Sequence, residues 1–548
     1  MLSGCIPWPQ DLANRYRQEG YWTSELLGNL LDRWIRAEGS RCALVTDDGT
    51  TTYAELDERV QRLSSGLHQI GIGVGDRVVV QLPNSVELVI ISLALFRLGA
   101  MPVFALVAHR RYEIVYLCNS SEARGYVIPG VHQGFDYRAL ASEVLASAPC
   151  LRYVISTGDS GSFLTLNDLA DPRPVEYPNI DPAEVAFFLL SGGTTGTPKL
   201  IPRTHQDYAY QLRKTAEAVG LDRNSVYLAA LPAAHNAALG CPGVLGTLRA
   251  GGKVVLVDSA SPGEVFPLIK REQVTLTTLM PSILKLWVEM VDFLPADLSG
   301  VLLQVGGARL DPEVARDVYR KLGARLTHWF GMAEGFLSHT RLDDPEEVVV
   351  HSAGRPLCAA DEIRVVDETD RDVGPGQTGE LLVRGPYTLR GYYKAADYNQ
   401  ATFTTDGYLR TGDLVRITER GDMTVEGRIK EIVNRNGEKV PVEELEQHLV
   451  THAGVRQAAV VAMPDAEMVE KTCAFIVAGP RAPEAAELRQ FLRDSGLAEY
   501  KLPDHFEFVE SLPYTAIGKI NKRLLRERVA TLPLDNKVGS RIQPPSAS

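Results

Sequence analysis

The chain has 548 residues, far too many for one ordinary hydrophobic core, so two or more domains are expected. Hydrophobic residues make up 45% of the sequence and charged residues 23%, which is typical of soluble globular proteins. A net charge of −12 excludes a broadly basic, nucleic-acid-binding surface, so any bound anion must meet a local cluster of positive groups.

Cysteine usage and the N-terminal region bear on the compartment. The seven cysteines show no Cys-x-x-Cys pair and no Cys/His metal spacing, which argues against a disulfide framework or a zinc site. The N-terminus lacks the basic and apolar regions of a signal peptide. Residues 88–108 are the most apolar region, but Arg97, Gly99 and Pro102 interrupt them, which favours a buried helix and a strand over a membrane span. We therefore expect a cytoplasmic protein without a membrane or nucleic-acid partner.

The first part of the chain alternates between strand and helix patterns. Thr52 and Glu55 have the spacing of a helix capping box and precede apolar residues on a helical period. Strand, helix and strand patterns follow at residues 77–82, 86–98 and 102–107, and again at residues 254–257, 264–271, 274–279 and 301–305. This alternation predicts layered α/β subdomains with largely parallel sheets. From residue 361 the pattern changes to short alternating strands and turns, which predicts a β-rich subdomain.

The last part of the chain has a pattern of its own beyond a boundary near residues 426–431. It comprises a helix at 442–449, strands at 457–462 and 472–477, a helix at 485–495 and a strand at 505–509. Such a segment can form a small α+β domain. We predict a large N-terminal domain in residues 1–428, a small C-terminal domain in residues 429–535 and a flexible polar tail in residues 536–548.

Residues 191–199, with the sequence Ser-Gly-Gly-Thr-Thr-Gly-Thr-Pro-Lys, follow directly after the apolar run 185–190. Glycines let the backbone approach a phosphate closely, hydroxyl and N–H groups bond its oxygens, and the lysine supplies positive charge. The segment is not a Walker A loop, because Pro198 precedes Lys199 and Leu200 follows it. Clusters of Gly, Ser and Thr are also common in flexible surface loops, so the other motifs have to decide.

Five further motifs follow this loop in order. They are Gly306-Gly307-Ala308, Phe330-Gly331-Met332-Ala333-Glu334-Gly335, Tyr408-x-x-Thr411-Gly412-Asp413, Glu426-Gly427-Arg428-Ile429-Lys430-Glu431 and Thr515-Ala516-Ile517-Gly518-Lys519. Their order and spacing resemble the adenylate-forming superfamily of acyl-CoA synthetases, nonribosomal peptide adenylation domains and luciferases, over nearly the whole chain. Residues 7–9, 200–205 and 341–345 are most similar to the stand-alone aryl acid–AMP ligases of siderophore-type assembly lines.

The resemblance implies an enzyme that activates an aryl carboxylic acid with ATP and Mg²⁺. The carboxylate attacks the α-phosphate to give aryl-AMP and pyrophosphate. The aryl group then passes to the phosphopantetheine thiol of an aryl carrier protein in siderophore or nonribosomal peptide biosynthesis. Because two anions must meet, such catalysis rests on positioning and electrostatic stabilisation. Three alternatives stay open: coenzyme A as the acceptor, a binding protein that has lost catalysis, and a luciferase-like oxygenase.

The resemblance also implies an ATP site. Its residues are Ser191, Gly192, Gly193, Thr194, Thr195, Gly196, Lys199, Gly307, Ala308, Phe330, Gly331, Met332, Ala333, Glu334, Asp413, Arg428 and Lys519. Glu334 is expected to bind Mg²⁺, since a hard cation prefers carboxylate oxygen. Asp413 is expected to accept hydrogen bonds from both ribose hydroxyls, and Arg428 to reach the ribose or a phosphate. An ordinary loop acid at Glu334 and an Asx turn at Asp413 are the structural alternatives.

Lys519, Lys199 and Glu334 are the expected catalytic residues. By resemblance, Lys519 bonds the substrate carboxylate and reduces its repulsion from the phosphate. Lys430 lies where the family has a hinge between the large domain and a mobile small domain. A rotation there is expected to withdraw Lys519 before the thiol attacks.

The acid site is expected to comprise His235, Asn236, Ala237, Gly240, Cys241, Gly307, Gly331, Leu337 and Lys519. In the 2,3-dihydroxybenzoate enzymes the matching Asn meets the 2-hydroxyl side, a Ser stands at the position of Cys241 and a Val at that of Leu337. A thiol is a weak hydrogen-bond partner, and a buried unpaired 3-hydroxyl costs ~1–3 kcal/mol. Salicylate is therefore favoured, with 2,3-dihydroxybenzoate as an alternative. Ala237 and Gly240 are smaller than usual, which predicts room for a ring-substituted salicylate or a bicyclic 2-hydroxyaryl acid.

Overall fold

The computed structural model of the chain describes residues 1–191, 198–307, 310–367, 369–428, 432–435, 437–465, 468–513, 520 and 522–530. Contacts between residues divide the chain into two compact units. The larger unit comprises Met1–Val107, Ile114–Ser191 and Lys199–Ile429, and the smaller unit comprises Ala108–Glu113, Gly192–Pro198 and Lys430–Ser548.

One sheet of the larger unit has seven strands in the order β11-β10-β4-β3-β5-β8-β9. Their bounds are Leu200–Thr204, Val185–Leu190, Met101–Phe104, Arg77–Val80, Gly125–Ile128, Tyr153–Ser156 and Leu164–Thr165. Neighbouring strands are parallel except for β10 and β11, which form an antiparallel pair. The chain between these two strands is the glycine-rich segment of residues 191–199, so the hairpin fixes where that segment begins and ends.

A second sheet has nine strands in the order β18-β17-β16-β15-β14-β12-β13-β1-β2. Their bounds are Arg355–Pro356, Phe336–His339, Arg325–Met332, Leu302–Gly306, Leu276–Leu279, Val226–Ala229, Lys253–Leu256, Cys42–Thr46 and Gly49–Thr52. The strands from β16 to β1 are parallel. Successive residues of β13 enter different cores, with Val254 in one and Val255 in the other, because strand side chains alternate between faces.

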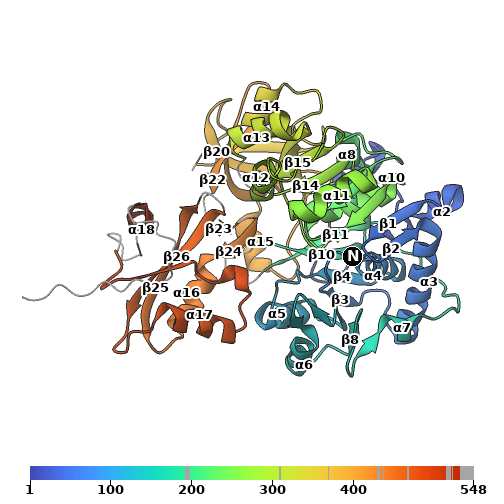
Figure 1. Ribbon diagram of the computed structural model, residues 1–548, viewed down its shortest axis with the longest axis horizontal. Coiled ribbons are helices and arrows are strands. Elements are labelled where there is room, and N and C mark those ends of the chain that lie inside the picture. The colour runs from blue at the N-terminus through green and yellow to red at the C-terminus, as the bar shows by residue number, and fades with distance from the viewer. Residues whose placement is uncertain are drawn as a thin grey trace, which may run out of the picture. The chain divides into compact units, whose positions relative to one another are not determined.

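Helices cover both sheets and join them through a shared core. Thr52 and Glu55 form the predicted capping box at the start of α3 (Tyr53–Gln69). α3 lies beside α4 (Val86–Leu98) next to β1 and β2 (Figure 1). The outer face of the nine-stranded sheet packs against α11 (Pro262–Glu272) and α12 (Pro281–Met290). The outer face of the seven-stranded sheet packs against α5 (Arg111–Ser121) and α6 (Tyr137–Ser147).

The larger unit contains further helices besides those that cover the two sheets. They are α1 (Gln10–Gln18), α2 (Asp32–Glu38), α7 (Leu166–Leu169), α8 (His205–Ala218), α9 (Asn236–Gly240), α10 (Gly243–Ala250), α13 (Pro312–Asp317), α14 (Glu346–His351) and α15 (Ala396–Thr402). Of these, α9 carries Asn236, Ala237 and Gly240 of the predicted acid site, and α8 contacts α9.

A third sheet forms the predicted β-rich subdomain. Its strands are β19 (Glu362–Val366), β20 (Thr378–Arg384), β21 (Leu409–Ile417) and β22 (Met423–Arg428). All three neighbouring pairs are antiparallel. A short turn joins β21 to β22, whereas residues 385–408, which include α15, connect β20 to β21.

The smaller unit has a sheet of its own with five strands. They are β23 (Ile432–Arg435), β24 (Glu438–Pro441), β25 (Val455–Asp465), β26 (Val469–Ala478) and β27 (His505–Phe508), with helices α16 (Val442–Val450), α17 (Ala485–Asp494) and α18 (Lys522–Val529). Two apolar clusters lie within this unit. The predicted fold class, with layered α/β subdomains, a β-rich subdomain and a small α+β domain, is confirmed. The exact domain boundaries stay a prediction.

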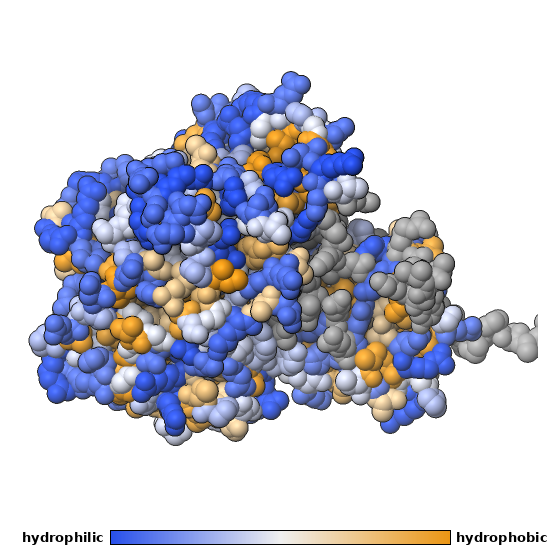
Figure 2. Space-filling view, turned by 180° about the vertical axis from the view of Figure 1, so that it is seen from behind, coloured by the Kyte–Doolittle hydropathy of each residue, from blue (hydrophilic) through white to orange (hydrophobic). Residues whose placement is uncertain are grey.

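The most apolar stretch of the sequence is inside the protein. Every residue of α4 from Leu88 to Leu98 is buried, including Arg97. The Arg97 guanidinium donates hydrogen bonds to the Gly28 carbonyl at 3.0 Å and to Asp57 at 2.5 Å. Among the residues that the structure describes, no helix has the length and apolar character that crossing a membrane requires. Figure 2 shows a face on which hydrophilic residues predominate and hydrophobic ones are scattered in small groups.

Candidate functional site

The β10–β11 hairpin closes the base of the glycine-rich segment. The backbone N–H of Ser191 donates to the Lys199 carbonyl at 2.9 Å, and the N–H of Lys199 donates to Ser191 Oγ at 3.2 Å. Lys199 Nζ lies 3.8 Å from the centroid of the Tyr398 ring, a cation–π contact. The predicted site residues Gly192, Gly193, Thr194, Thr195 and Gly196 lie outside the described residues.

Glu334 lies in the turn that follows β16. The Tyr392 hydroxyl donates a hydrogen bond to Glu334 Oε1 at 2.9 Å. The Tyr392 ring meets the Tyr398 ring edge to face, with centroids 5.2 Å apart. Two tyrosines thus connect the carboxylate of Glu334 to the ammonium of Lys199. The sequence analysis missed both tyrosines, although the Gly391-Tyr392-Tyr393 run marks the place.

A single close backbone approach explains the glycine next to Glu334. Gly335 has a φ of +102°, and a Cβ there would lie 1.6 Å from the Tyr387 carbonyl oxygen. Only glycine satisfies both conditions, so Gly335 fixes the turn that carries Glu334.

Asp413 and Arg428 are neighbours across the third sheet. They are paired in the antiparallel register of β21 and β22. Asp413 is buried in β21, and its N–H donates to Thr411 Oγ1 at 3.0 Å; Gly412, which lies between them, has a φ of +71°. The structure thus pairs two residues from consecutive motifs, both of which the sequence predicts near the nucleotide.

The predicted adenine-side residues lie at the ends of β15 and β16. Gly307 follows β15 with a φ of +83°, and Ala308 lies outside the described residues. Phe330 is half-buried on β16 and packs near Phe336, with ring centroids 6.4 Å apart. Met332 and Ala333, which complete this motif, are also half-buried and pack against the main core. Their predicted ATP role stays a prediction.

Several predicted acid-site residues belong to one apolar cluster. This acid cluster contains Ala13, Tyr16, Trp22, Tyr210, Leu231, Ala237, Ala238, Cys241, Trp329, Leu337, Cys358 and Tyr387. Gly331 lies opposite Leu337 in the β16–β17 register, and a Cβ on Gly331 would lie 2.2 Å from Leu337 Cδ2. Leu337 therefore covers Gly331 directly. The sequence analysis missed the N-terminal members of the cluster, although the Pro-Trp-Pro run at residues 7–9 lies just before them.

The predicted His-Asn pair lies at the start of the short helix α9, where its two members have different surroundings. His235 is exposed and caps the helix, with its Nδ1 accepting from the Ala237 N–H at 3.3 Å. Asn236 is buried and bonded to the Tyr208 hydroxyl at 3.0 Å. His235 thus has a structural role in α9, and Asn236 is the polar member of the pair that faces the protein interior.

The missing side chain at Gly240 does not leave open space. A Cβ on Gly240 would lie 2.2 Å from Tyr208 Oη. The volume beside Gly240 is therefore occupied by Tyr208 and adds no room for the acid. Ala237, which is buried in the acid cluster, is the remaining position at which the sequence predicts extra space.

A buried carboxyl group lies on one side of the acid cluster. The Tyr387 hydroxyl accepts from the Leu337 N–H at 3.2 Å and donates to Asp361 Oδ2 at 2.9 Å. The Cys358 N–H also donates to Asp361, at 3.1 Å. Burial raises the pKa of Asp361 to about 7, although these hydrogen bonds oppose the shift. No motif pointed to this residue.

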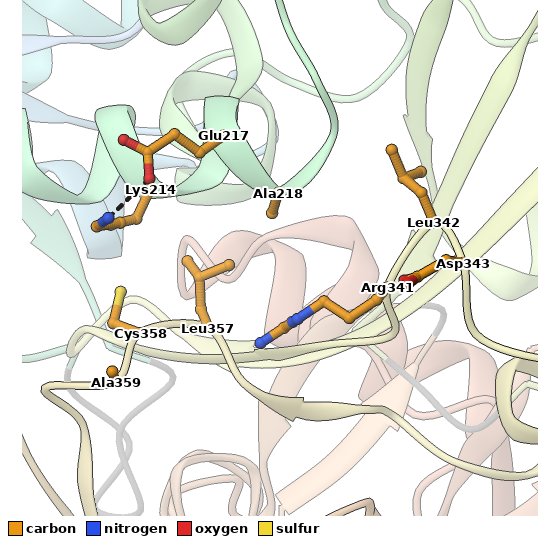
Figure 3. Close-up of a pocket in the computed structure, with 9 residues that line it drawn as sticks. All are labelled: Lys214, Glu217, Ala218, Arg341, Leu342, Asp343, Leu357, Cys358 and Ala359. Atoms are coloured by element: carbon orange, nitrogen blue, oxygen red, sulfur yellow. Dashed lines mark hydrogen bonds and ion pairs between the residues drawn. The ribbon is translucent and has the colours of Figure 1, made fainter.

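A hollow of about 380 Å³ borders the same cluster at Cys358 (Figure 3). Lys214, Glu217 and Ala218 line it from α8, and Arg341, Leu342, Asp343, Leu357, Cys358 and Ala359 line it from the facing segments. Lys214 Nζ and Glu217 form an ion pair at 2.7 Å. The hollow contains none of the predicted acid-site residues, so it is distinct from that site.

Lys519, Lys430 and Ala308 lie outside the described residues, and their predicted roles stay predictions. Arg428 is described through its backbone position in β22. Among the described residues, no group of three or more His, Cys, Asp and Glu side chains could hold a metal ion. A cation at Glu334 would thus need further ligands from the nucleotide, as is common for Mg²⁺.

The chain is similar to known proteins over nearly its whole length. The chain matches the AMP-binding enzyme family over residues 31–393 and the AMP-binding enzyme C-terminal domain over residues 444–519. It is 51% identical to the 2,3-dihydroxybenzoate-AMP ligase of Bacillus subtilis strain 168, with 97% of this chain and 98% of that protein covered. It is 43% identical to the salicyl-AMP ligase / salicyl-S-ArCP synthetase of Mycobacterium tuberculosis H37Rv, with 96% and 94% covered. The apo structure of MbtA from Mycobacterium smegmatis superimposes with a TM-score of 0.75 and 43% identity, covering 96% of this chain and 99% of that one.

Proposed function

The chain belongs to the family of AMP-binding enzymes, and on that premise we propose that it is an aryl acid–AMP ligase acting on a 2-hydroxyaryl carboxylic acid of the salicylate type. ATP is the second substrate, and aryl-AMP and pyrophosphate are the products. The aryl group then passes to the phosphopantetheine thiol of an aryl carrier protein. The names of the salicylate and dihydroxybenzoate relatives support an aryl acid but do not choose between the two.

The observation that carries the choice of acid is the surroundings of Asn236. Cys241 and Leu337 lie in the acid cluster, while Asn236 lies 3.6 Å from Cys241 through its amide nitrogen. A thiol and a leucine give a 3-hydroxyl no strong hydrogen-bond partner, and an unpaired buried hydroxyl costs ~1–3 kcal/mol. Salicylate or a salicylate with an apolar substituent thus fits better than 2,3-dihydroxybenzoate.

The residues that we expect to surround the phosphates of ATP support a role in adenylation. The hairpin holds Lys199 beside the glycine-rich segment, where its charge would stabilise the leaving pyrophosphate. Glu334 carries one hydrogen bond from Tyr392 and, among the described residues, no recorded ion pair, so its carboxylate is suited to hold Mg²⁺. Bound there, Mg²⁺ would neutralise phosphate charge. Asp413 would orient the ribose, and Lys519 would orient the attacking carboxylate.

The test is acid-dependent exchange of pyrophosphate into ATP with benzoate, salicylate, 2,3-dihydroxybenzoate, methylsalicylates and bicyclic 2-hydroxyaryl acids. We expect salicylate or a substituted salicylate to give the highest kcat/KM. A clear preference for 2,3-dihydroxybenzoate would overturn the argument from Cys241. Thioester formation with a phosphopantetheinylated carrier protein and with coenzyme A, measured side by side, then identifies the acceptor.

A further inference from the structure

A buried polar network runs from Arg203 on β11 along α8. The Arg203 guanidinium is fully buried, and its Nε donates to Asp207 Oδ1 at 2.9 Å. Its Nη1 donates to the Ala333 carbonyl at 3.0 Å, and its Nη2 donates to Gln211 Oε1 at 2.9 Å. A guanidinium has five donors and no acceptor, and it stays charged in proteins. The Gln211 atom that faces it must therefore be the amide oxygen.

The other end of the Gln211 amide has an equally definite partner. Gln211 Nε2 lies 2.9 Å from the carbonyl oxygen of Gly240, an atom that can only accept. A pure donor on one side and a pure acceptor on the other leave a single orientation for this amide. In that orientation Nε2 also donates to Asn236 Oδ1 at 3.3 Å.

The direction of the Gln211 amide fixes the direction of the Asn236 amide. The Tyr208 hydroxyl donates to Asn236 Oδ1 at 3.0 Å, in addition to the bond from Gln211. With two donors on Oδ1, the nitrogen Nδ2 takes the opposite side, 3.6 Å from Cys241 Sγ. This sulfur is the single acceptor recorded for Nδ2 among the described residues, and a thiol accepts weakly. Nδ2 thus has donor capacity for a ligand.

We propose that Gln211 is a positioning residue that holds the Asn236 amide nitrogen toward the bound acid, so that the site selects aryl acids with a hydrogen-bond acceptor at the ortho position. The inference rests on the proposed function, in which Asn236 meets the acid. An ortho hydroxyl meets this requirement. Its hydrogen atom is donated to the adjacent carboxylate, and its oxygen accepts a hydrogen bond from Nδ2. An ortho amino group presents hydrogens to a nitrogen that also carries hydrogens.

The ion pair at the start of the network makes the arrangement rigid. Arg203 on β11 and Asp207 in the first turn of α8 have exposed side-chain fractions of 0% and 1%. Asp207 also accepts from the Thr204 N–H and hydroxyl in the capping box of α8. Turning Arg203 away from Gln211 would leave a buried charge without its partners, which is strongly unfavourable. The position of the Arg203 guanidinium therefore sets the orientation of the Gln211 amide, which in turn sets the orientation of the Asn236 amide.

The experiment compares kcat/KM in pyrophosphate exchange for salicylate, 2-fluorobenzoate, anthranilate and benzoate. In the unmodified enzyme we expect salicylate to exceed anthranilate by about tenfold or more, with 2-fluorobenzoate above benzoate. Gln211→Met keeps the length of the side chain but removes its donor, and we expect it to lower the salicylate-to-benzoate ratio about tenfold. Tyr208→Phe removes the other donor to Oδ1 and is expected to shift the ratio in the same direction.

Thr215→Val is the matched control. Thr215 is buried on the same helix and donates only to backbone carbonyls of that helix, at 2.8 Å and 3.2 Å. We expect this variant to lower the midpoint of thermal unfolding while leaving the salicylate-to-benzoate ratio unchanged.

Three results would contradict the inference: anthranilate used as well as salicylate by the unmodified enzyme, an unchanged salicylate-to-benzoate ratio in Gln211→Met, or an unchanged ratio in Tyr208→Phe. If Gln211→Met does not fold, the inference is tested by the salicylate-to-benzoate ratio of Tyr208→Phe and by the order of kcat/KM values for the four acids in the unmodified enzyme. An unmodified enzyme that exchanges pyrophosphate with none of these acids refutes the proposed function itself, which separates the two failures.

Discussion

Single residues in the larger unit show how burial changes chemistry. Asp361 would ordinarily titrate near pH 4, but burial raises its pKa to about 7 in the folded chain. Between these two values the folded protein keeps a proton that the unfolded chain has released. The free energy of unfolding contributed by this group therefore falls as the pH rises from about 4 to about 7 and stays low above that.

Asp361→Asn removes this pH dependence. We compare the free energy of unfolding of the variant with that of the unmodified protein. We expect the difference, variant minus unmodified, to rise by about 2 kcal/mol from pH 5 to pH 8. Urea unfolding of both proteins at the two pH values measures the difference. Asp48→Asn, which replaces an exposed aspartate, serves as the control. Parallel profiles for Asp361→Asn and the unmodified protein would show that this carboxyl does not titrate in that range.

Tyr392 illustrates a residue that acts through another. Its hydroxyl donates to Glu334, and a hydrogen bond to a charged group is worth ~1.5–3 kcal/mol. Tyr392→Phe keeps the ring contact with Tyr398 but removes this donor. We expect the Mg²⁺ concentration for half-maximal pyrophosphate exchange to rise about tenfold, with little change in the KM for the acid. Tyr398→Phe keeps both ring contacts and should match the unmodified enzyme. An unchanged Mg²⁺ requirement in Tyr392→Phe would contradict the prediction that Tyr392 positions Glu334 for the metal.

At the scale of elements, α8 connects the β10–β11 hairpin to the predicted acid site. It begins at a capping box formed by Thr204 and Asp207, directly after β11. Its inner face carries Tyr208 and Gln211, and its outer face lines the hollow in Figure 3 through Lys214. A shift of α8 would therefore move the residues that hold Asn236.

The capping boxes of α3 and α8 allow a loss of stability to be distinguished from a loss of acid binding. Thr204→Ala and Thr52→Ala each remove the N-cap side chain of a capping box, and each should cost about 1–2 kcal/mol of stability. We expect only Thr204→Ala to raise the KM for the acid, by several-fold, because α3 carries no site residue. Urea unfolding and acid-dependent exchange measure the two effects. Equal KM values in both variants would show that α8 holds the acid site without its cap.

Local sequence signals predicted most elements and missed some. The predicted helix at residues 86–98 coincides with α4, since a capped, continuously apolar segment of that length packs as a buried helix. The strand predicted at residues 102–107 is Met101–Phe104, because its end depends on pairing with β3. The β23–β24 hairpin was missed, although the Asn-Gly dipeptide at residues 436–437 is a strong hairpin signal.

At the scale of the whole molecule, the chain forms two units with separate cores. The predicted catalytic lysine, Lys519, belongs to the smaller unit, whereas β10, β11, Lys199 and the acid cluster belong to the larger one. An enzyme built in this way can supply Lys519 for one half-reaction and withdraw it for the other.

Lys519→Ala separates the two half-reactions. We expect loss of acid-dependent pyrophosphate exchange by at least 100-fold, because the carboxylate loses the charge that offsets its repulsion from the α-phosphate. Thioester formation from supplied aryl-AMP should stay within a few-fold of the unmodified enzyme. Equal loss of both half-reactions would contradict a role confined to adenylation.

The sequence by itself determined the family, the layered α/β class and the reaction, because motif order and hydrophobic periodicity are properties of the chain alone. Only the tertiary structure decided how the site residues are held. It placed Gln211 against Asn236, 25 positions away, and Tyr392 against Glu334, 58 positions away. It also filled the space beside Gly240 with Tyr208. Such contacts depend on how α8, α9 and the sheets pack against one another, and no local pattern encodes side-chain direction across that packing.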